Sequence, residues 1–424
     1  MSASALRLAA SLGLGETPLE LPEPERRGTP LEGLPCVAPE SEAQLVALVR
    51  AAAAERLRLL PLGAGTHLWT APWPAGAPRP DLGVSLGRFR GIVAHEPGDG
   101  TLTARAGTPL AELAAAAAST GQHLTPALGS RRSHATLGGT LAAGQSGWER
   151  LRYGPARHHV LGARMLLASG ERVNSGGRLV KNVTGYDLHR LFVGSQGTLG
   201  FLLEASLRLF PRPKARARLC LQGLDAESAF KRAAALHSLA LPLEQLAIGA
   251  LEPHSERVRL VAQLAGSPAG LEADLQSARE LLPGAELELD PPEPETPWSL
   301  AALEPGAEAW LELSGLPSHG LALWRLLGAR LEALGIHSQR VCDPALMRLC
   351  VLGPLPSRAA FERLAADLPA LSGSPRWLCR EARSLPLAPS APPGVPLRQR
   401  IEQALDPQAM FPKGRLHPAG EARL

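Results

Sequence analysis

The stretch from Gly138 to Gly200 decides the fold of this chain: it contains GGTLAAGQSG (138–147), VLGARMLLASG (160–170) and KNVTGYDLHRLFVGSQGTLG (181–200). Glycines at this density allow the backbone to approach a ligand closely, because no Cβ atom intervenes. Between the glycine clusters, the turn Ala168–Glu171 separates Val160–Leu167 from Arg172-Val173 and predicts a β-hairpin. The pattern predicts a large, flat, phosphorylated cofactor that several loops surround.

A second glycine cluster lies upstream, where the predicted strand Arg58–Leu62 leads into GAGTH at 63–67. A Gly-x-Gly turn after a strand aims successive N–H groups into one concavity, which suits a phosphate. A Rossmann dinucleotide fingerprint requires a third glycine and a helix that follows it. Here the third glycine is missing, and Pro72 and Pro74 prevent a helix from continuing, so we exclude a Rossmann unit.

The composition is typical of a soluble globular enzyme, with 424 residues, 45% hydrophobic, 20% charged and a net charge of +4. Two tyrosines and seven phenylalanines are few for stacking on bases, which argues against a nucleic-acid partner. The five cysteines contain no Cys-x-x-Cys pair, which argues against a zinc ribbon or a cysteine-ligated iron–sulfur cluster. No apolar run reaches the roughly 18 residues of a membrane span. We therefore expect a cytoplasmic protein, peripheral at the inner face of the membrane only through partners.

Composition and predicted elements divide the chain into four segments. We expect an N-terminal tail and linker at 1–35, a cofactor-binding domain at 36–213, a cap domain for substrate or partner at 214–384, and a connector with a tail that returns to the cofactor site at 385–424. Within the cofactor-binding domain, 38–42 opens a helix that runs to Ala54, and 92–94 and 102–106 are strands. Thr108 is the expected N-cap of a helix from Pro109 to Ser119, and Phe201–Phe210 is a strand.

The order β-α-β-β-α-β occurs twice in 214–384. The predicted strands are 217–222, 244–250, 257–264, 285–289, 309–314, 337–342, 346–352 and 375–380, and the predicted helices are 225–238, 269–282, 318–333 and 357–368. This order is typical of two ferredoxin-like units, which we expect to form one long antiparallel sheet. The predicted fold class is α+β: a cofactor-binding fold of two subdomains followed by this cap.

The segment from Leu62 to Pro213 resembles the FAD-binding domain of the vanillyl-alcohol oxidase/para-cresol methylhydroxylase family. Within that family, the motifs are most similar to those of the FAD-binding subunit of glycolate oxidase complexes. Besides the stretches that open this section, the matching motifs are PLGAGT (61–66), TLTARAGTPLAEL (101–113), ATLGGTLAAGQSG (135–147) and the C-terminal DPQAMFPKGR (406–415).

The resemblance implies FAD that lies extended between the two subdomains, with its pyrophosphate on the backbone of 63–66. The implied cofactor-binding residues are Gly63, Ala64, Gly65, Thr66, His67, Thr136, Gly138, Gly139, Gly144, Gly147, Gly194, Gly197, Thr198, Gly200 and Arg415. Some relatives attach flavin to a histidine near the position of His67. The subset matched here does not keep one, so we expect non-covalent FAD.

Several positions keep two interpretations open. Lys181, Tyr186 and Asp187 match the family's K-x-x-x-G-Y-D-L motif; Lys181 suits an anion, whereas Tyr186 and Asp187 either brace a loop or act directly. Arg415 either meets the flavin or substrate, or pairs with an acid of the FAD domain. His158 and His159 follow a Tyr-Gly pair, and because neighbours on a strand point to opposite faces, at most one of them faces the flavin.

No catalytic residue and no metal ligand is assigned from the sequence. Oxidation of a 2-hydroxy acid by flavin requires a base for the hydroxyl proton and a cation for the carboxylate. Many catalytic relatives hold the substrate with a metal on two histidines near a G-D-G-N stretch of the cap. The only G-D-G here is a turn at 98–100, and the histidines after residue 200 are isolated, at His237, His254, His319, His337 and His417.

Three functions therefore remain. The first is an FAD-binding subunit of a glycolate (2-hydroxy acid) oxidase complex, which passes electrons to a partner; the partners would be a second flavoprotein subunit and an iron–sulfur subunit. The second is a self-sufficient FAD-linked oxidoreductase with an unidentified substrate. The third is a scaffold subunit with a decayed flavin site, and the intact glycine loops count against it.

Overall fold

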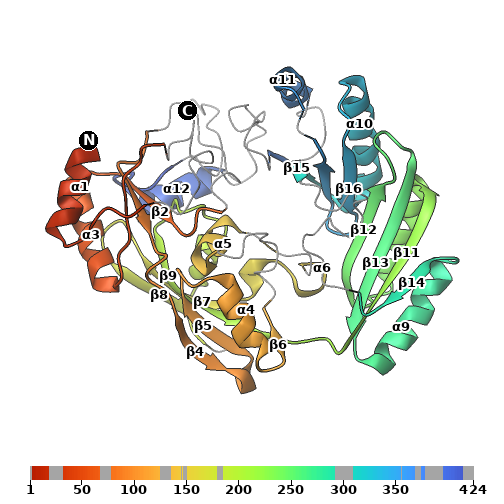
Figure 1. Ribbon diagram of the computed structural model, residues 1–424, viewed down its shortest axis with the longest axis horizontal. Coiled ribbons are helices and arrows are strands. Elements are labelled where there is room, and N and C mark those ends of the chain that lie inside the picture. The colour runs from red at the N-terminus through yellow and green to blue at the C-terminus, as the bar shows by residue number, and fades with distance from the viewer. Residues whose placement is uncertain are drawn as a thin grey trace. The chain divides into compact units, whose positions relative to one another are not determined.

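The structure is a computed structural model that describes residues 2–18, 32–66, 78–124, 135–144, 146, 150–178, 185–291, 309–354, 356–367, 374–377 and 395–413. The chain divides into two compact units (Figure 1). The first unit comprises Met1–Ser146, Pro155–Arg212 and Ala391–Leu424, and the second comprises Gly147–Gly154 and Pro213–Ser390. No helix in the described part of the chain is both long enough and apolar enough to cross a membrane.

A small parallel sheet in the first unit carries the upstream glycine turn. Its strand order is β1-β3-β2, with β1 at Cys36–Val37, β3 at Leu82–Ser85 and β2 at Leu59–Leu62. Helix α3 (Glu42–Ala54) buries Leu45, Leu48 and Val49, which recur at helical spacing. Helix α1 (Ser2–Ser11) lies beside α3 (Figure 1). The glycine turn begins where β2 ends, at one edge of this sheet.

The second sheet of this unit is antiparallel and five-stranded, in the order β4-β5-β9-β7-β8. Its strands are β4 (Ile92–Glu96), β5 (Thr101–Arg105), β9 (Phe201–Arg208), β7 (Val160–Leu166) and β8 (Arg172–Gly176). The remaining elements of the unit are η2 (Pro97–Asp99), α4 (Leu110–Ala118), β6 (Gln122–His123), α5 (Leu137–Ala143), η3 (Ala156–His158), α7 (His189–Phe192), β10 (Phe210–Pro211) and α12 (Val395–Leu405).

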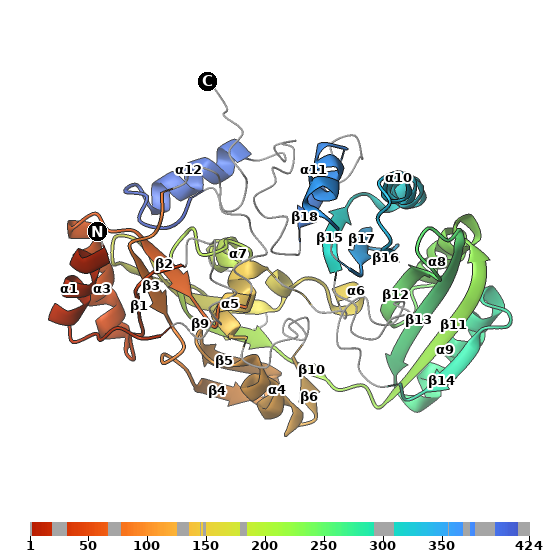
Figure 2. The same cartoon turned by 45° about the horizontal axis from the view of Figure 1, so that its top comes forward.

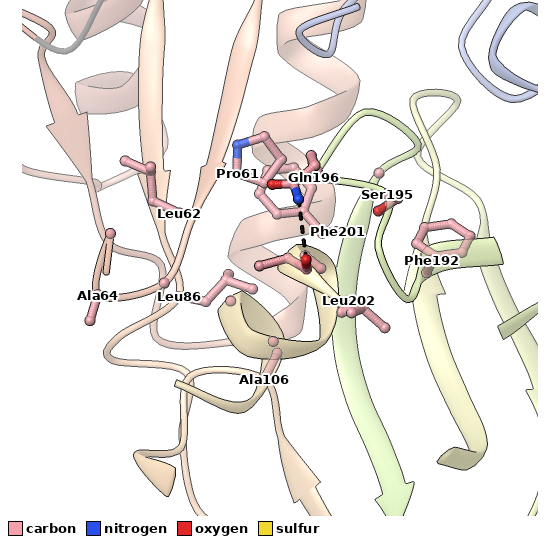
Figure 3. A pocket seen from close by; sticks show the side chains of 18 of the residues that line it. Pro61, Leu62, Ala64, Leu86, Ala106, Phe192, Ser195, Gln196, Phe201 and Leu202 are labelled. Carbon is pink, nitrogen blue, oxygen red and sulfur yellow. Dashed lines mark hydrogen bonds between the residues drawn. The ribbon is translucent and has the colours of Figure 1, made fainter. Parts of the chain in front are cut away.

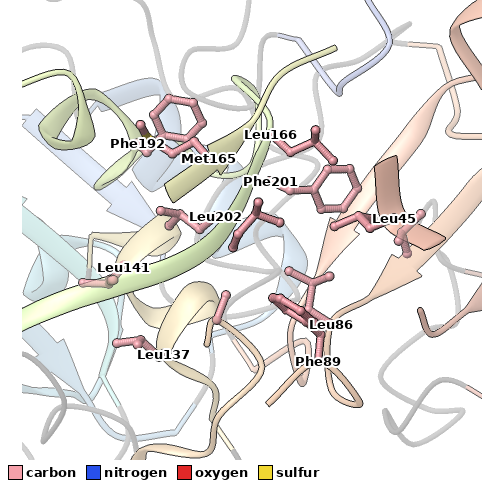
Figure 4. Packing of buried hydrophobic residues seen from close by; sticks show 14 of the residues in the cluster. Leu45, Leu86, Phe89, Leu137, Leu141, Met165, Leu166, Phe192, Phe201 and Leu202 are labelled. Atoms are coloured by element: carbon pink, nitrogen blue, oxygen red, sulfur yellow. The ribbon is translucent and has the colours of Figure 1, made fainter. Parts of the chain in front are cut away.

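One apolar core joins these sheets and helices. It includes Leu45 of α3, Leu137 of α5 and Met165 of β7 (Figure 4). Phe201 of β9 is fully buried and meets the Phe411 ring edge-on at 5.6 Å between centroids. The core therefore extends from the N-terminal helices to residues 410 and 411, which are distant in the sequence.

The second unit has one eight-stranded antiparallel sheet, in the order β14-β11-β13-β12-β16-β17-β15-β18. Its two halves meet where β12 pairs with β16, Ile248 opposite Cys342. Its elements are α6 (Arg150–Tyr153), β11 (Ala215–Asp225), α8 (Ala226–Ser238), β12 (Leu243–Ala250), β13 (Arg257–Gly266), α9 (Pro268–Leu281), β14 (Glu286–Leu289), β15 (Ala309–Ser314), η4 (Pro317–His319), α10 (Gly320–Ala333), β16 (Gln339–Asp343), β17 (Arg348–Leu352), α11 (Arg358–Asp367) and β18 (Ser374–Trp377).

The two faces of this sheet differ in chemistry. Helices α8 and α9 pack on the half formed by β11 and β13, over an apolar core that contains Leu219 and Leu260 (Figure 2). The alternation of side chains along a strand sends the intervening residues to the other face. There Arg348 pairs with Glu312 at 2.6 Å, and Arg216 pairs with the buried Glu244 at 3.0 Å.

The structure confirms the predicted mixture of helices and antiparallel sheets. The β-hairpin is present as β7 and β8, and its turn lies where the sequence predicts it. One local prediction is wrong, because Thr108 does not cap α4. Pro109 occupies the N-cap position, and the Thr108 hydroxyl instead accepts a hydrogen bond from the Gly91 N–H at 2.9 Å. The threonine thus joins the chain before β4 to the start of α4.

Ser41→Ala should lower the free energy of unfolding by about 1 kcal/mol, because it removes the N-cap of α3. The Ser41 hydroxyl accepts from the Gln44 N–H at 3.2 Å, and the Gln44 side chain accepts from the Ser41 N–H at 3.2 Å. Urea unfolding would measure the loss. Ser41→Asp should restore most of it, since aspartate also caps well. Equal stability of Ser41→Ala and the parent chain would contradict this role of Ser41.

Candidate functional site

A pocket in the first unit gathers the glycine-rich segments (Figure 3). It encloses about 710 Å³ of empty space, a volume that includes its open mouth. Its lining comes from the end of β2, the turn after it, α5, the 192–197 loop and the start of β9. The lining residues are Pro61, Leu62, Gly63, Ala64, Gly65, Thr66, Leu86, Ala106, Gly138, Gly139, Ala142, Ala143, Phe192, Ser195, Gln196, Gly197, Gly200, Phe201 and Leu202.

The turn at 63–66 offers unused backbone donors to this pocket. Within the described residues, the N–H groups of Gly63, Ala64, Gly65 and Thr66 make no hydrogen bond. Gly65 has φ of 74°, in the left-handed region where glycine is unstrained. The described lining contains no lysine or arginine. Among the described residues, the groups of this turn that suit an anion are therefore its backbone N–H groups.

Helix α5 packs directly against this turn. A Cβ atom at Gly63 would collide with the Thr136 Oγ1 atom and lie 3.5 Å from the Gly139 Cα. The Thr136 Oγ1 atom caps α5 by accepting from the Gly139 N–H at 3.3 Å. The N–H groups of Leu137 and Gly138 donate to the carbonyls of Thr108 and Ala106. The first N–H groups of α5 are thus satisfied within the protein, whereas those of the 63–66 turn have no acceptor among the described residues.

The loop after α7 closes the other end of α5. The Gly194 N–H donates to the Leu141 carbonyl at 2.9 Å, and the Gln196 N–H donates to the Ala142 carbonyl at 2.8 Å. The Gln196 side chain adds a bond from Nε2 to the Ala143 carbonyl at 3.2 Å (Figure 3). These bonds satisfy the carbonyl groups that a helix leaves exposed at its C-terminus.

Two glycine contacts in this region serve packing. Gly144 has φ of 64°, and a Cβ atom there would lie 3.0 Å from the Gly194 Cα. Gly200 has φ of 143°, and a Cβ atom there would meet the Leu166 carbonyl oxygen of β7. Both positions therefore bring two backbone segments closer than any side chain would allow.

The structure brings together eight of the predicted cofactor-binding residues on the pocket wall: Gly63, Ala64, Gly65, Thr66, Gly138, Gly139, Gly197 and Gly200. Thr136, Gly144, Gly194 and Thr198 lie behind that wall, where they cap, pack or hydrogen-bond its segments. His67, Gly147 and Arg415 lie outside the described residues, as does Lys181.

Sequence reasoning missed the apolar part of the lining and two polar residues, Ser195 and Gln196. The missed apolar residues are Pro61, Leu62, Leu86, Ala106, Ala142, Ala143, Phe192, Phe201 and Leu202. In the sequence these side chains are indistinguishable from core residues. Only Gln196 could have been suspected from the sequence, because it lies between Gly194 and Gly197 in a glycine-rich loop. Its φ is 55°, which is unusual for a residue with a side chain.

The Gly-Tyr-Asp-Leu motif is held by a buried histidine that the sequence reasoning did not single out. The Ser175 hydroxyl donates to the Tyr186 carbonyl at 3.2 Å and contacts His189 Nδ1 at 3.1 Å, and His189 Nε2 meets the Val160 carbonyl at 3.1 Å. Burial lowers the pKa of His189, and the charge of Asp187 opposes that shift. Asp187 itself pairs with Arg190 at 2.9 Å, whereas the Tyr186 side chain is 90% exposed.

The sequence analysis places His158 and His159 on a strand, and this prediction is wrong. Residues 156–158 form the 3₁₀-helix η3, and His159 follows as its C-cap. His158 is exposed, and the buried His159 meets the Phe210 ring edge-on at 5.4 Å. Neither residue lines the pocket. Among the described residues, no group of three or more histidine, cysteine, aspartate or glutamate side chains has the geometry to hold a metal ion.

Comparison with known proteins shows which proteins the residues of this site resemble. Residues 35–176 match the family model described as an FAD binding domain. The chain is 37% identical over 198 residues to the glycolate oxidase subunit GlcE of Escherichia coli (strain K12), a match that covers 47% of this chain and 53% of the relative. It is 32% identical over 185 residues to the subunit GlcD of Bacillus subtilis (strain 168), covering 43% and 38%.

A third relative, a D-2-hydroxyglutarate dehydrogenase of Xanthomonas citri pv. viticola, is 36% identical over 188 residues, which cover 44% of this chain and 39% of the relative. The chain thus spans about half, or less, of the length of the curated relatives that it matches. A solved structure of alkyldihydroxyacetonephosphate synthase shares the fold, with a TM-score of 0.68 and 14% identity; the match covers 89% of this chain and 76% of that one.

Gly139→Val should abolish FAD binding while the protein remains folded. Gly139 lines the pocket, where a branched side chain would occupy space beside the 63–66 turn. The flavin absorbance per protein in the purified variant would measure the loss. Gly270→Val is the matched control, because Gly270 likewise donates its N–H to the capping residue Ser267 but lies exposed on α9. Stoichiometric FAD in Gly139→Val would show that this wall does not contact the cofactor.

Proposed function

Because this chain carries an FAD-binding domain of the vanillyl-alcohol oxidase/para-cresol methylhydroxylase family, we propose that it is the FAD-binding subunit of a 2-hydroxy-acid (glycolate) oxidase or dehydrogenase complex. The observation that carries the proposal is the pocket wall at 63–66, where four backbone N–H groups are unused among the described residues and Gly63 and Gly65 have no side chain of their own. The similarity to a chain named as a glycolate oxidase subunit supports the complex.

The residues of the pocket fit FAD. The turn at 63–66 would hold the pyrophosphate, and Gly138 and Gly139 would allow a flat group to lie close to α5. The apolar lining, including Phe201 and Leu202, would exclude water from the cofactor. When bound, FAD would accept a hydride from the substrate carbon that carries the hydroxyl group. His67, Gly147, Arg415 and Lys181 remain proposed contacts.

The second unit is proposed as the cap that receives substrate or partner, with each half of its sheet a ferredoxin-like unit. The strand orders β14-β11-β13-β12 and β16-β17-β15-β18 support this interpretation. The proposed boundaries are 1–35, 36–213, 214–384 and 385–424. The proposed partners are a second flavoprotein subunit and an iron–sulfur subunit, which together would place the complex in the cytoplasm or at the inner face of the membrane.

A second candidate is a self-sufficient FAD-linked dehydrogenase. The similarity to a D-2-hydroxyglutarate dehydrogenase favours it, since that relative is named as an enzyme rather than as a subunit. The expectation that the histidines of 214–384 are isolated is wrong for one pair, because the rings of His254 and His337 lie 5.2 Å apart between centroids. This pair belongs to no group of three or more possible metal ligands among the described residues, which favours dependence on a partner for substrate orientation. A scaffold with a decayed flavin site fits least, because the glycine contacts of the pocket are intact.

FAD should be bound without a covalent link, because the backbone donors at 63–66 account for anion binding by themselves. Precipitation of the purified chain with acid should release yellow flavin into the supernatant. Colour that stays with the pellet would contradict the prediction and direct attention to His67.

The lone chain should oxidise glycolate or D-lactate at less than about one hundredth of the rate of the reconstituted complex, because a missing general base alone costs 10²–10⁴ in rate. A dye-linked 2-hydroxy-acid dehydrogenase assay of both preparations would measure the ratio. A complex assembled with the Gly139→Val chain is the control for flavin on this subunit. Full activity of the lone chain would favour the self-sufficient enzyme.

A further inference from the structure

Residues 406–411 form a turn that belongs to the first unit, although they are distant in sequence from its sheets. The Asp406 carboxylate is fully buried, and its two oxygens accept from the N–H groups of Met410 and Phe411, each at 2.9 Å. Inside the turn, Ala409 has φ of 54°, in the left-handed region that is unfavourable for a residue with a side chain. Such a conformation persists only where the surrounding bonds hold it, so the Asp406 carboxylate determines the course of the turn.

Further hydrogen bonds anchor the turn on helix α12. The Asp406 N–H donates to the Glu402 carbonyl at 2.9 Å, and the Ala409 N–H donates to the Asp406 carbonyl at 3.2 Å. The Nζ atom of Lys413 donates to the same Asp406 carbonyl at 2.9 Å and to the Gln403 side chain at 3.3 Å. The backbone and the side chain of Asp406 thus hold the two ends of the turn together.

The turn contacts two segments that lead into the pocket. The Met410 carbonyl accepts from the Leu59 N–H at 2.9 Å, and β2 is the last strand in the order β1-β3-β2, so this bond covers its open edge. The Phe411 ring meets the Phe201 ring of β9 edge-on, at 5.6 Å between centroids. Phe201 lines the pocket, and Leu59 lies two residues before Pro61, which also lines it.

These contacts support the pocket without forming its surface. Met410 and Phe411 are buried in the core of the first unit, and neither residue lines the pocket. The unused N–H groups of the 63–66 turn follow β2 directly. A shift of β2 would therefore move these donors relative to α5, and a binding site loses affinity when its groups are held loosely.

We propose that Asp406 is a positioning residue for FAD: by fixing the 406–411 turn against Leu59 and Phe201, it holds β2 and the start of β9 in the arrangement that binds the cofactor. The proposal rests on the proposed FAD site. It couples the turn and the cofactor in both directions, because a contact that favours FAD binding is itself favoured by bound FAD. Bound FAD should therefore slow the opening of the 406–411 turn.

Asp406→Asn tests the proposal, because an amide has one acceptor oxygen where the carboxylate has two. Either the Met410 or the Phe411 N–H then loses its acceptor, and the turn loosens. The variant should bind FAD roughly tenfold more weakly than the parent chain, the effect of one lost hydrogen bond to a charged group. Titration of the full chain with FAD, followed by flavin fluorescence, would measure both dissociation constants.

Ser41→Ala is the matched control for a loss of stability. Ser41 caps α3 in the same unit and does not line the pocket, so this variant should unfold more easily but bind FAD as the parent chain does. Phe411→Leu is the second variant, in case Asp406→Asn does not fold. It keeps an apolar side chain in the core, loses the ring contact with Phe201, and should also bind FAD more weakly than the parent chain.

Hydrogen exchange measures the same coupling from the side of the turn. In the parent chain, saturating FAD should slow the exchange of the Met410 and Phe411 N–H groups. The Gln44 N–H, which donates to the Ser41 cap, should exchange at the same rate with and without FAD.

Three results would overturn the inference while the FAD site stands. They are parent-like FAD affinity in Asp406→Asn or Phe411→Leu, an equal loss of affinity in Ser41→Ala, and exchange of the Met410 and Phe411 N–H groups that does not respond to FAD. Failure of the parent chain itself to bind FAD would instead contradict the proposed cofactor site, and this inference with it.

Discussion

The close approach of the turn at Gly63 to helix α5 is the contact on which the rest of the site depends. Only a residue without a side chain fits between β2 and Thr136, because a Cβ atom at Gly63 would collide with the threonine hydroxyl. That hydroxyl is already engaged as the cap of α5. Displacing it would leave the Gly139 N–H without its acceptor, and an unsatisfied buried donor costs about 1–3 kcal/mol. The position of the turn and the start of the helix are therefore set together.

This arrangement leaves the donors of the 63–66 turn available to a ligand. The N-terminal N–H groups of α5 are used by Thr108, Ala106 and Thr136, and its C-terminal carbonyls are used by Gly194 and Gln196. Within the described residues, the 63–66 turn keeps its N–H groups free. Because these donors are fixed by packing before a ligand arrives, an anion that binds them incurs little ordering entropy.

Local signals in the sequence predicted most elements and about half of the pocket. The glycines at 63, 65, 138 and 139 could be predicted as pocket residues from the local sequence, because a tight turn or a close backbone approach requires glycine whatever the rest of the chain does. Helix α3 could be predicted from its N-cap Ser41 and from the helical spacing of its leucines. The predicted role of Thr108 as a helix cap is wrong because its hydroxyl accepts a hydrogen bond from the N–H of Gly91, a residue remote from it in sequence. The apolar lining could not be predicted, because it arises from contacts between distant segments of the chain.

The polar face of the eight-stranded sheet differs from the pocket in that it holds buried charged side chains. Arg348 and Glu312 form an ion pair with both side chains largely removed from solvent, and the buried Glu244 pairs with Arg216. Replacement of such pairs by apolar residues is often neutral or stabilising, so stability alone does not account for them. Next to Arg348, burial raises the pKa of Asp343 to about 6, against the opposing bonds of the Leu346 and Ala345 N–H groups and the charge of Arg348. Burying charged and titratable groups costs desolvation free energy. This face of the sheet therefore favours contact with polar or charged groups over contact with an apolar surface. The helix-covered face, with Leu349 and Val351 in the core, already provides the apolar burial that stabilises the sheet.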